Sequence, residues 1–228
     1  MKEPSSTPSR RSYGQSCPVA HALDLVGDRW ALLVIRELRL GPRRFADLDA
    51  ALPGIGPSVL SQRLRELVAV GVLERTPLPP PGRGEMYRLT TWGAELEPVF
   101  RALARWGAGS PVVPLRGPIS DDAVMLGVRT FLELGRPEMP ASGWLAVALE
   151  RERYALDVAE GRLTRLVRGD FPPGIEAEAR LQTDATTVQA LLIGRATPAT
   201  VIGAGRVQLS GAEALSGWFL SAVTGRAA

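Results

Sequence analysis

The sequence predicts an α+β protein built from two domains, on three observations. In the first half, apolar residues recur at helical spacing in several short segments, and two extended runs, VLERT and EMYRL, follow them. In the second half, runs such as GWLAVALE and RYALDVAEG have the alternating side-chain pattern of strands, and helical segments lie between such runs. The chain has 228 residues, of which 45% are hydrophobic, enough for two cores. We therefore expect a mainly helical N-terminal domain and an α+β C-terminal domain.

Composition places the boundaries of these domains. Residues 1–15 contain few apolar side chains and are expected to form a disordered arm. A Gly- and Pro-rich stretch at 108–118 predicts a linker between an N-terminal domain at 16–107 and a C-terminal domain at 119–228.

Positive charge is concentrated in the first half. Residues 1–110 hold 15 Lys and Arg against 11 Asp and Glu, a net +4, and the remainder holds 12 against 13, a net −1. Nearly all of the cations are arginine, the residue suited to bidentate contacts with phosphate and guanine. This balance is compatible with a polyanionic partner, and equally with a mildly basic domain that has none.

Four helices are expected before the first strand. Pro18 suits the first turn of a short helix, and Asp28 is expected to cap a second helix at 29–40. A third helix is expected at 45–52, and Pro57 opens the fourth after the tight turn PGIG. A helix, a short turn and a helix with a polar outer face form a helix-turn-helix.

The two extended runs predict a wing after the helix-turn-helix. The loop PLPPPGRG joins them and carries Arg83 at its tip. Thr90 or Thr91 is expected to cap a last helix at 92–107, and Pro98 should kink or break its first turns.

The fourth helix carries two different stripes. Leu60, Leu64 and Leu67 form an ordinary core face. The opposite side carries short hydroxyls, an amide and a guanidinium, which hydrogen-bond base edges and phosphates: Ser58, Ser61, Gln62 and Arg65. The alternative is a solvated helix face without a partner.

The N-terminal domain resembles the HxlR-type winged helix-turn-helix regulators. The motifs CPV, GDRW, LGPRRF and LSQRLREL, and then TxWG with L.PV and L..W, occur in order over residues 16–107. The resemblance implies a transcription regulator that dimerises through the first and last helices of this domain and places two recognition helices in successive major grooves of double-stranded operator DNA. One departure is Gly56, where such proteins usually cap the recognition helix with Ser or Thr.

Roles for the basic residues follow from this resemblance. Gln62 suits adenine, and Arg65 suits guanine or phosphate. Arg43 and Arg44, at the start of the third helix, are expected to contact phosphate, Arg63 flanks the groove-facing stripe, and Arg83 would meet the minor groove or the backbone.

The only cysteine, Cys17, lies at the expected N-cap of the first helix, where unpaired N–H groups favour a thiolate. Redox sensing is one interpretation, and a small residue that fills the dimer contact is the other. One cysteine and one histidine exclude an intrachain disulfide and a Cys/His metal cluster.

The C-terminal segment resembles a sterol-carrier-protein type 2-like domain over residues 119–226. In LQTDATTVQALLIGRATPATVIGAGRVQLSGAEALSGWF, TD starts a helix, a glycine ends it, and a strand leads to the last helix. The resemblance implies an apolar cavity that binds a hydrophobic molecule. Its candidate lining residues are Phe131, Trp144, Leu192, Trp218 and Phe219. The alternative is that these side chains simply fill the core. Asp121 and Asp122 are interpreted as caps of the helix that follows them.

The expected function is therefore that of a dimeric DNA-binding regulator, with control by a hydrophobic ligand in the C-terminal domain. The alternative is a lipid-binding or transfer protein whose winged helix is a protein-interaction module. No catalytic constellation, cofactor motif or phosphate loop is recognisable, so an enzyme is not expected. No apolar run approaches the about 18 residues that span a bilayer, so a cytoplasmic protein without membrane partners is expected.

Overall fold

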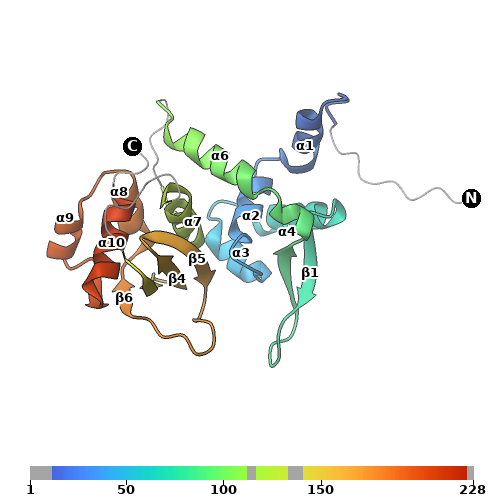
Figure 1. The fold of residues 1–228 in the computed structure, drawn as a ribbon. Coiled ribbons are helices and arrows are strands. Elements are labelled where there is room, and N and C mark those ends of the chain that lie inside the picture. Colours follow the sequence, from blue (N-terminus) through green and yellow to red (C-terminus); the bar gives the residue numbers. More distant parts are fainter. Residues whose placement is uncertain (1–11, 112–116, 133–140, 225–228) are drawn as a thin grey trace, which may run out of the picture. The chain divides into compact units, whose positions relative to one another are not determined.

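The computed structural model describes residues 12–111, 117–132 and 141–224 (Figure 1). The chain forms two compact units, and the boundary between them in the sequence lies between Glu95 and Leu96. Most of the expected arm and the centre of the expected linker lie outside the described residues. Where the arm is described, Ser12 Oγ and the backbone N–H of Tyr13 donate hydrogen bonds to the Asp24 carboxylate, at 2.8 and 2.9 Å. The end of the arm is therefore bonded to the first helix.

The first unit contains a helix-turn-helix and a wing. Its elements are α1 (Pro18–Val26), α2 (Ala31–Glu37), α3 (Phe45–Ala51), α4 (Pro57–Ala69), β1 (Leu73–Pro77), β2 (Glu85–Leu89) and α5 (Thr91–Ala94). The strands β1 and β2 pair antiparallel, from Leu73 opposite Leu89 to Pro77 opposite Glu85. The expected helix-turn-helix and the wing strands are confirmed in these residues.

The second helix differs from the prediction. It covers only Ala31–Glu37, and its N-cap is Trp30, without a side-chain cap. The Asp28 carboxylate, expected to cap it, instead forms an ion pair with Arg63 on α4. The sequence pattern identified Asp28 as a strong capping residue but could not show that a guanidinium from a later helix competes for it.

The core of the first unit lies between α2, α3 and α4. Val34 and Ile35 of α2, Leu48 of α3, and Leu60 and Leu64 of α4 are completely buried. Each such side chain contributes about 1.5–3 kcal/mol by leaving water. The helix α4 is therefore held by one face, and its other face remains available.

Gly93 of α5 lies against the backbone just before the first wing strand. A Cβ at this position would lie 2.2 Å from the carbonyl oxygen of Val72, so only glycine fits. Thr90 caps α5, because its Oγ1 accepts a hydrogen bond from the Gly93 backbone N–H at 3.0 Å. The TxWG motif thus has a local explanation: a capping threonine and a glycine at a close backbone approach.

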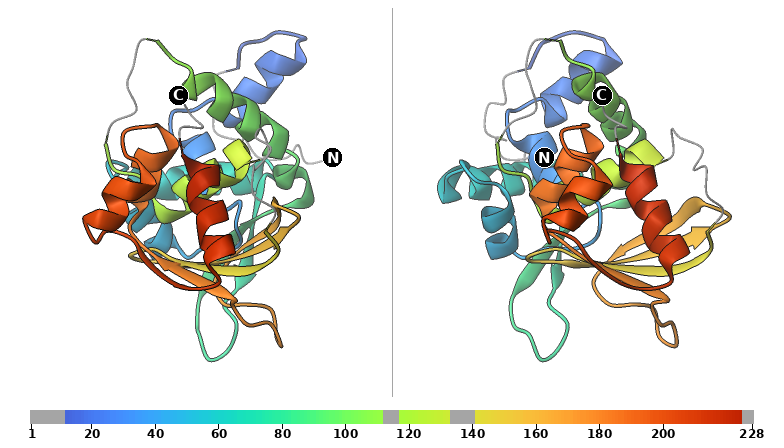
Figure 2. Two further views of the ribbon diagram at one scale, coloured as in Figure 1. Left: turned by 60° about the vertical axis from the view of Figure 1, so that its left-hand side comes forward. Right: turned by 90° about the vertical axis from the view of Figure 1, so that its left-hand side faces the viewer.

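The second unit is a sheet with helices on one face. Its elements are α6 (Glu97–Ala108), α7 (Asp121–Leu132), β3 (Gly143–Ala148), β4 (Arg153–Ala159), β5 (Arg162–Arg168), β6 (Ala179–Gln182), α8 (Ala185–Leu192), α9 (Pro198–Gly203), β7 (Gln208–Gly211) and α10 (Glu213–Val223). The strand order is β5-β4-β3-β6-β7, in which β3 and β6 are parallel and the other neighbours are antiparallel. Figure 2 shows α10 and α8 on the same side of this sheet.

Pro98 breaks the last helix of the expected N-terminal domain, as predicted. The segment forms the short α5 and then α6, with Pro98 in the first turn of α6. The helix α6 packs against α7, and Glu97 Oε1 of α6 accepts a hydrogen bond from Arg129 Nη2 of α7 at 2.6 Å. The sequence-based boundary assigned α6 to the N-terminal domain, whereas in the structure it groups with the second unit.

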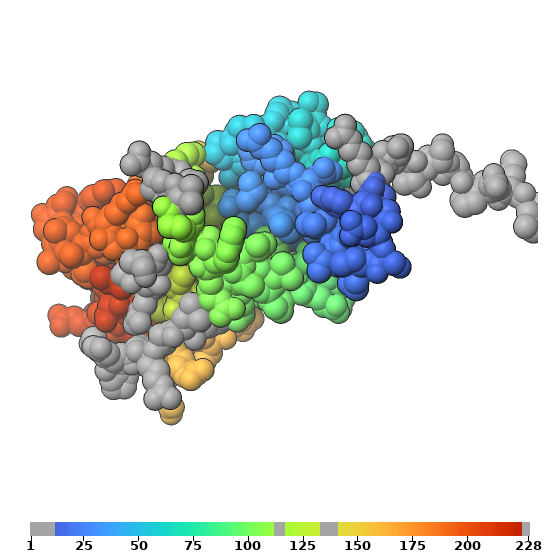
Figure 3. All heavy atoms as spheres, turned by 90° about the horizontal axis from the view of Figure 1, so that it is seen from above, coloured from blue at the N-terminus to red at the C-terminus, as the bar shows by residue number. Residues whose placement is uncertain are grey.

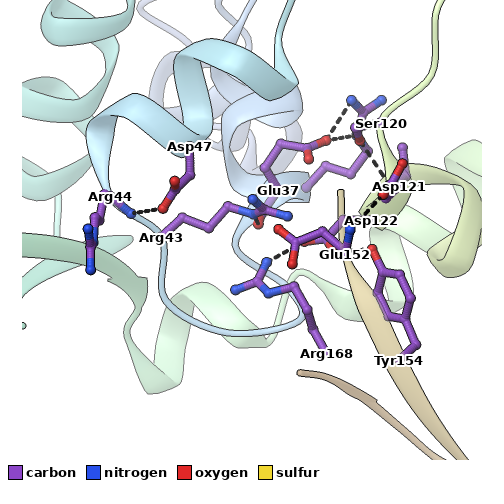
Figure 4. Close-up of polar contacts among 12 residues, drawn as sticks. Glu37, Arg43, Arg44, Asp47, Ser120, Asp121, Asp122, Glu152, Tyr154 and Arg168 are labelled. Carbon is purple, nitrogen blue, oxygen red and sulfur yellow. Dashed lines mark hydrogen bonds and ion pairs between the residues drawn. The ribbon is translucent and has the colours of Figure 1, made fainter. Parts of the chain in front are cut away.

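The start of α7 is tied to the sheet by two adjacent carboxylates (Figure 4). Asp122 accepts a hydrogen bond from Tyr154 Oη at 2.8 Å and pairs with Arg168, while Asp121 accepts backbone N–H bonds from Arg151 and Glu152. The cap itself comes from another residue: Ser120 Oγ accepts the Ala123 N–H. The interpretation of the two aspartates as caps was therefore wrong, because strands distant in sequence supply stronger partners.

No helix within the described ranges combines the length and the apolar character that a membrane span requires.

Candidate nucleic-acid interface

The outer face of α4 is polar and open to solvent. Ser58, Gln62 and Arg65 are exposed, and Ser61 between them is half-buried. The buried residues Leu60, Leu64 and Leu67 alternate with them along the helix. The periodicity that predicted two stripes is thus observed as two faces, one in the core and one in solvent.

The polar side chains of this face bond to one another along the helix. Gln62 Nε2 donates to Glu66 Oε1 at 2.9 Å, and Arg65 Nη1 donates to Ser61 Oγ at 3.0 Å. Exposed pairs spaced four residues apart contribute only about 0.2–0.5 kcal/mol. Base edges or phosphates can therefore replace these partners at little cost.

Arg63 has a different environment from its neighbours on α4. It pairs with Asp28 and, at 2.7 Å, with Glu66, and its side chain is only 14% exposed. The sequence placed Arg63 at the flank of the DNA-facing stripe. In the structure its guanidinium joins α4 to the segment before α2.

Arg43 and Arg44 are neighbours in sequence but lie in different environments. Arg43 exchanges two backbone hydrogen bonds with Tyr87, and its Nε donates to the carbonyl oxygen of Glu37. Arg44 is exposed, and its backbone N–H donates to Asp47 Oδ2 at 3.1 Å (Figure 4). Phosphate contact by Arg44 stays a prediction, whereas the Arg43 side chain is bonded within the fold.

Arg83 is exposed in the loop that joins the two strands of the wing. The strands themselves carry two further exposed arginines that the sequence reasoning missed, Arg75 and Arg88. Arg75 pairs with Glu85, and Arg88 pairs with Glu74.

Cys17 forms the N-cap of α1 and is half-buried. The backbone N–H groups of Ala20 and Val19 lower the pKa of its thiol. His21 is exposed, and its backbone N–H donates to the carbonyl oxygen of Cys17 at 2.9 Å, within the first turn.

Four of the five residues expected to line an apolar cavity are buried on helices, and the fifth, Trp144, lies on a strand. Trp218 and Phe219 of α10 are completely buried, and Trp218 Nε1 donates to the carbonyl oxygen of Gly161 at 2.8 Å. Phe131 and Leu192 are buried on α7 and α8. Trp144 is half-buried in β3 and stacks edge-to-face with Phe171. Because it alternates with the buried Leu145, Trp144 belongs to the sheet face opposite the helices.

A recognition helix with an exposed polar face and a two-stranded wing define the class of winged helix-turn-helix DNA-binding proteins. The model of the HxlR-like helix-turn-helix family matches residues 25–111. An uncharacterised HTH-type transcriptional regulator of Synechocystis sp. is 42% identical over 96 residues, which are 42% of this chain and 70% of that protein. A counterpart in Mycobacterium tuberculosis is 44% identical over 99 residues, which are 43% of this chain and 61% of that protein.

Two further relatives are the regulator YodB of Bacillus subtilis and a solved transcription factor. YodB is 36% identical over 91 residues, which are 40% of this chain and 81% of YodB. The crystal structure of the putative transcription factor PA1607 is 36% identical and covers 46% of this chain and 73% of that chain, with a TM-score of 0.41. The chain belongs to the HxlR-like helix-turn-helix family of transcriptional regulators. The expectation of a DNA-binding regulator, not an enzyme, is confirmed at the level of the family.

Proposed function

We propose that the protein binds operator DNA as a homodimer in the cytoplasm, with α4 in the major groove, and that its C-terminal unit is a sterol-carrier-like domain that controls DNA binding through a small ligand. The observation that carries the DNA-binding part is the exposed polar face of α4. Gln62 and Arg65 have the amide and guanidinium that read adenine and guanine, and Ser58 and Ser61 suit either base edges or phosphates.

Phosphate contacts are assigned to exposed arginines around α4. Arg44 lies at the start of α3, and Arg83 lies at the tip of the wing. Both have guanidinium groups open to solvent, which suits contacts that position a protein on the duplex without reading its sequence.

The dimer is supported by exposed apolar side chains on two helices. Val19 and Leu23 of α1 are exposed, although they belong to its apolar stripe. Val99, Leu103 and Trp106 of α6 are spaced as one stripe and are also exposed, Trp106 by 81%; the side chains of α6 are open to view in Figure 3. Apolar stripes of this kind are typical of helices that pack against a second copy.

The sterol-carrier-like assignment is supported by the order of elements in the second unit. Asp184 caps α8 by accepting the Thr187 N–H at 2.7 Å, as the TD of the motif requires. The helical segment ends before Gly194, and β7 leads directly into α10. This order agrees with the pattern on which the resemblance rests.

The decisive experiment measures binding of the full chain to the DNA upstream of its own coding sequence, by fluorescence anisotropy at several salt concentrations. Binding should be tighter than to random DNA of equal length. Arg44→Ala should reduce the salt slope by about one per subunit on both DNAs, while Arg162→Ala, an exposed arginine on β5, should not. Equal affinity for both DNAs would contradict the proposal and favour a lipid-binding protein with the winged helix as an interaction module.

A second role, redox sensing by Cys17, is favoured by the lowered pKa of its thiol. A thiolate reacts with oxidants, so peroxide should change the affinity for operator DNA, and Cys17→Ser should abolish that change. Alkylation of the thiol with iodoacetamide across pH should give a midpoint below the free value of about 8.5. A midpoint at the free value, together with binding that ignores peroxide, would leave only the packing role.

A further inference from the structure

The face of the sheet opposite α8 and α10 is hollowed by small residues. Ala146 and Ala148 of the central strand β3 alternate with the buried Leu145 and Val147, so they point to this second face. On β6 they are flanked by the longer Arg180 and Gln182, and on β4 Arg153 lies beside Ala148 while Ala155 lies beside Ala146. Alanines in the middle of an open sheet face leave a depression, which here is a cavity of about 510 Å³. Ligand sites usually have volumes of about 300–1,000 Å³.

Two arginines stand on opposite sides of this floor. Arg153 of β4 pairs with Ala148 in the strand register, and Arg180 of β6 pairs with Ala146. Both line the cavity and are exposed, and neither forms an ion pair with a residue that the structure describes. Since β4 and β6 lie on either side of β3, their backbones are separated by roughly 10 Å. A small anion between them can be reached by both guanidinium groups.

The rest of the lining favours an organic anion over inorganic phosphate. Phe171 contributes an aromatic wall from the loop after β5 and is fixed by its edge-to-face contact with Trp144, with ring centroids 5.7 Å apart. Gln182 and Gln208, opposite each other on β6 and β7, add amide groups. One carboxylate, Asp170, also lines the cavity, so the two arginines leave the cavity with a net positive charge. A charged head and an apolar body both find partners here.

We propose that this cavity binds a small organic carboxylate, whose head pairs with Arg153 and Arg180 and whose apolar body lies on the alanine floor against Phe171. The inference rests on the proposed ligand-binding role of the second unit and names its ligand class. It places the ligand on the open face of the sheet, whereas the aromatic residues between the sheet and α10 form the core.

The probe is naphthoate, with naphthamide as its neutral counterpart of equal shape. Isothermal titration calorimetry on the full chain should show saturable binding of naphthoate, and naphthamide should bind about tenfold more weakly, because it lacks the charge that pairs with the guanidinium groups. Arg153→Gln and Arg180→Gln should each weaken naphthoate binding by about tenfold. Arg165→Gln is the matched control: it removes an exposed arginine of β5 that does not line the cavity.

A second variant tests the floor without changing charge. Ala146→Leu fills the cavity and should abolish naphthoate binding, while thermal unfolding checks that the protein remains folded. Binding that is absent in the wild-type chain, equal for the amide, or unchanged in Arg153→Gln and Arg180→Gln would overturn the inference. Because calorimetry needs no DNA, such a failure is distinguishable from failure of operator binding, which is measured separately by anisotropy.

Discussion

Helices α4 and α10 each carry side chains that the sequence identified as functional, but their surroundings are opposite. On α4, Gln62 and Arg65 are exposed and bond to neighbours on the same helix. On α10, Trp218 and Phe219 are completely buried among other core residues. Polar residues on an amphipathic helix thus remain available for a partner, whereas aromatic residues on a helix buried on most sides serve the core.

The difference lies in the hydrophobic pattern of the two helices. In α4 the apolar residues occupy one face, so the sequence alone separates the inner from the outer side. In α10 the buried residues include Leu215, Trp218, Phe219, Leu220 and Val223, which surround most of the helix. No stripe then distinguishes a residue that lines a cavity from one that fills it, and only the three-dimensional packing can do so.

The largest effect is expected for Trp218→Ala. Removal of this fully buried indole, together with its hydrogen bond to Gly161, should lower the free energy of unfolding by about 3–5 kcal/mol. Urea unfolding followed by circular dichroism measures the loss. Trp144→Ala is the matched control and should cost less than half as much, because Trp144 is only half-buried. A near-neutral Trp218→Ala would mean that the indole borders a cavity after all.

Local sequence signals predicted most elements of the fold. Pro18, Pro57 and Pro98 mark the first turns of α1, α4 and α6, and the alternating runs of the second half became β3 to β7. Two of the predictions that differed, the caps assigned to Asp28 and Asp122, involve competition between distant groups. Asp28 pairs with Arg63, which is 35 residues away. Asp122 bonds to Tyr154 and Arg168, which are 32 and 46 residues away. Such pairings depend on tertiary structure and leave no local pattern.

The second prediction tests the exposed face of α4. Gln62→Ala should lower operator affinity by about 1–3 kcal/mol per half-site and leave binding to random DNA nearly unchanged, because an amide that reads a base has no role on a non-specific site. Anisotropy titrations on both DNAs measure the difference. Gln189→Ala, at a half-buried glutamine of α8 outside the cavity lining, should change neither. Equal losses on operator and random DNA would contradict base reading by Gln62.

The third prediction concerns the buried cluster at the start of α7. Burial, and then the charge of Asp122, raise the pKa of Tyr154 above its ordinary value. The unfolded chain therefore releases this proton near pH 10 while the folded chain keeps it, so stability falls as pH rises above about 10, by about 1.4 kcal/mol per pH unit.

Tyr154→Phe should remove this alkaline loss and cost about 1 kcal/mol at neutral pH, where only the hydrogen bond to Asp122 is missing. Urea unfolding at several pH values from neutral to alkaline measures both effects. Tyr13→Phe, at an exposed tyrosine, should keep the alkaline loss. If the two variants show the same pH dependence, Tyr154 does not carry it.

The candidate DNA site was predictable where exposure follows from helix periodicity and unpredictable where it depends on the backbone path. Ser58, Gln62 and Arg65 are exposed as the pattern of α4 indicates. Arg43 and Arg44 are indistinguishable in sequence, yet Arg43 forms a backbone bridge with Tyr87 of the wing. Tyr87, 44 residues later in the sequence, pairs with the backbone of Arg43, and the guanidinium of Arg44 remains exposed to solvent.

The smallest effect is expected at the start of α4. Gly56 is its N-cap, with extended backbone angles and no side-chain cap, and a Cβ there would meet no atom within 4 Å. Gly56→Ser should therefore fit without strain, and its hydroxyl can accept a backbone N–H of the first turn. Stability should rise by a few tenths of a kcal/mol, about what separates serine from glycine at this position. Gly56→Ala is the control, since it adds the Cβ without the hydroxyl. The same variant also tests a DNA contact. If Gly56→Ser binds operator and random DNA more tightly by the same factor, the serine hydroxyl contacts phosphate. If affinity is unchanged, the hydroxyl acts only on the helix. A stability below that of the alanine variant would contradict the capping argument.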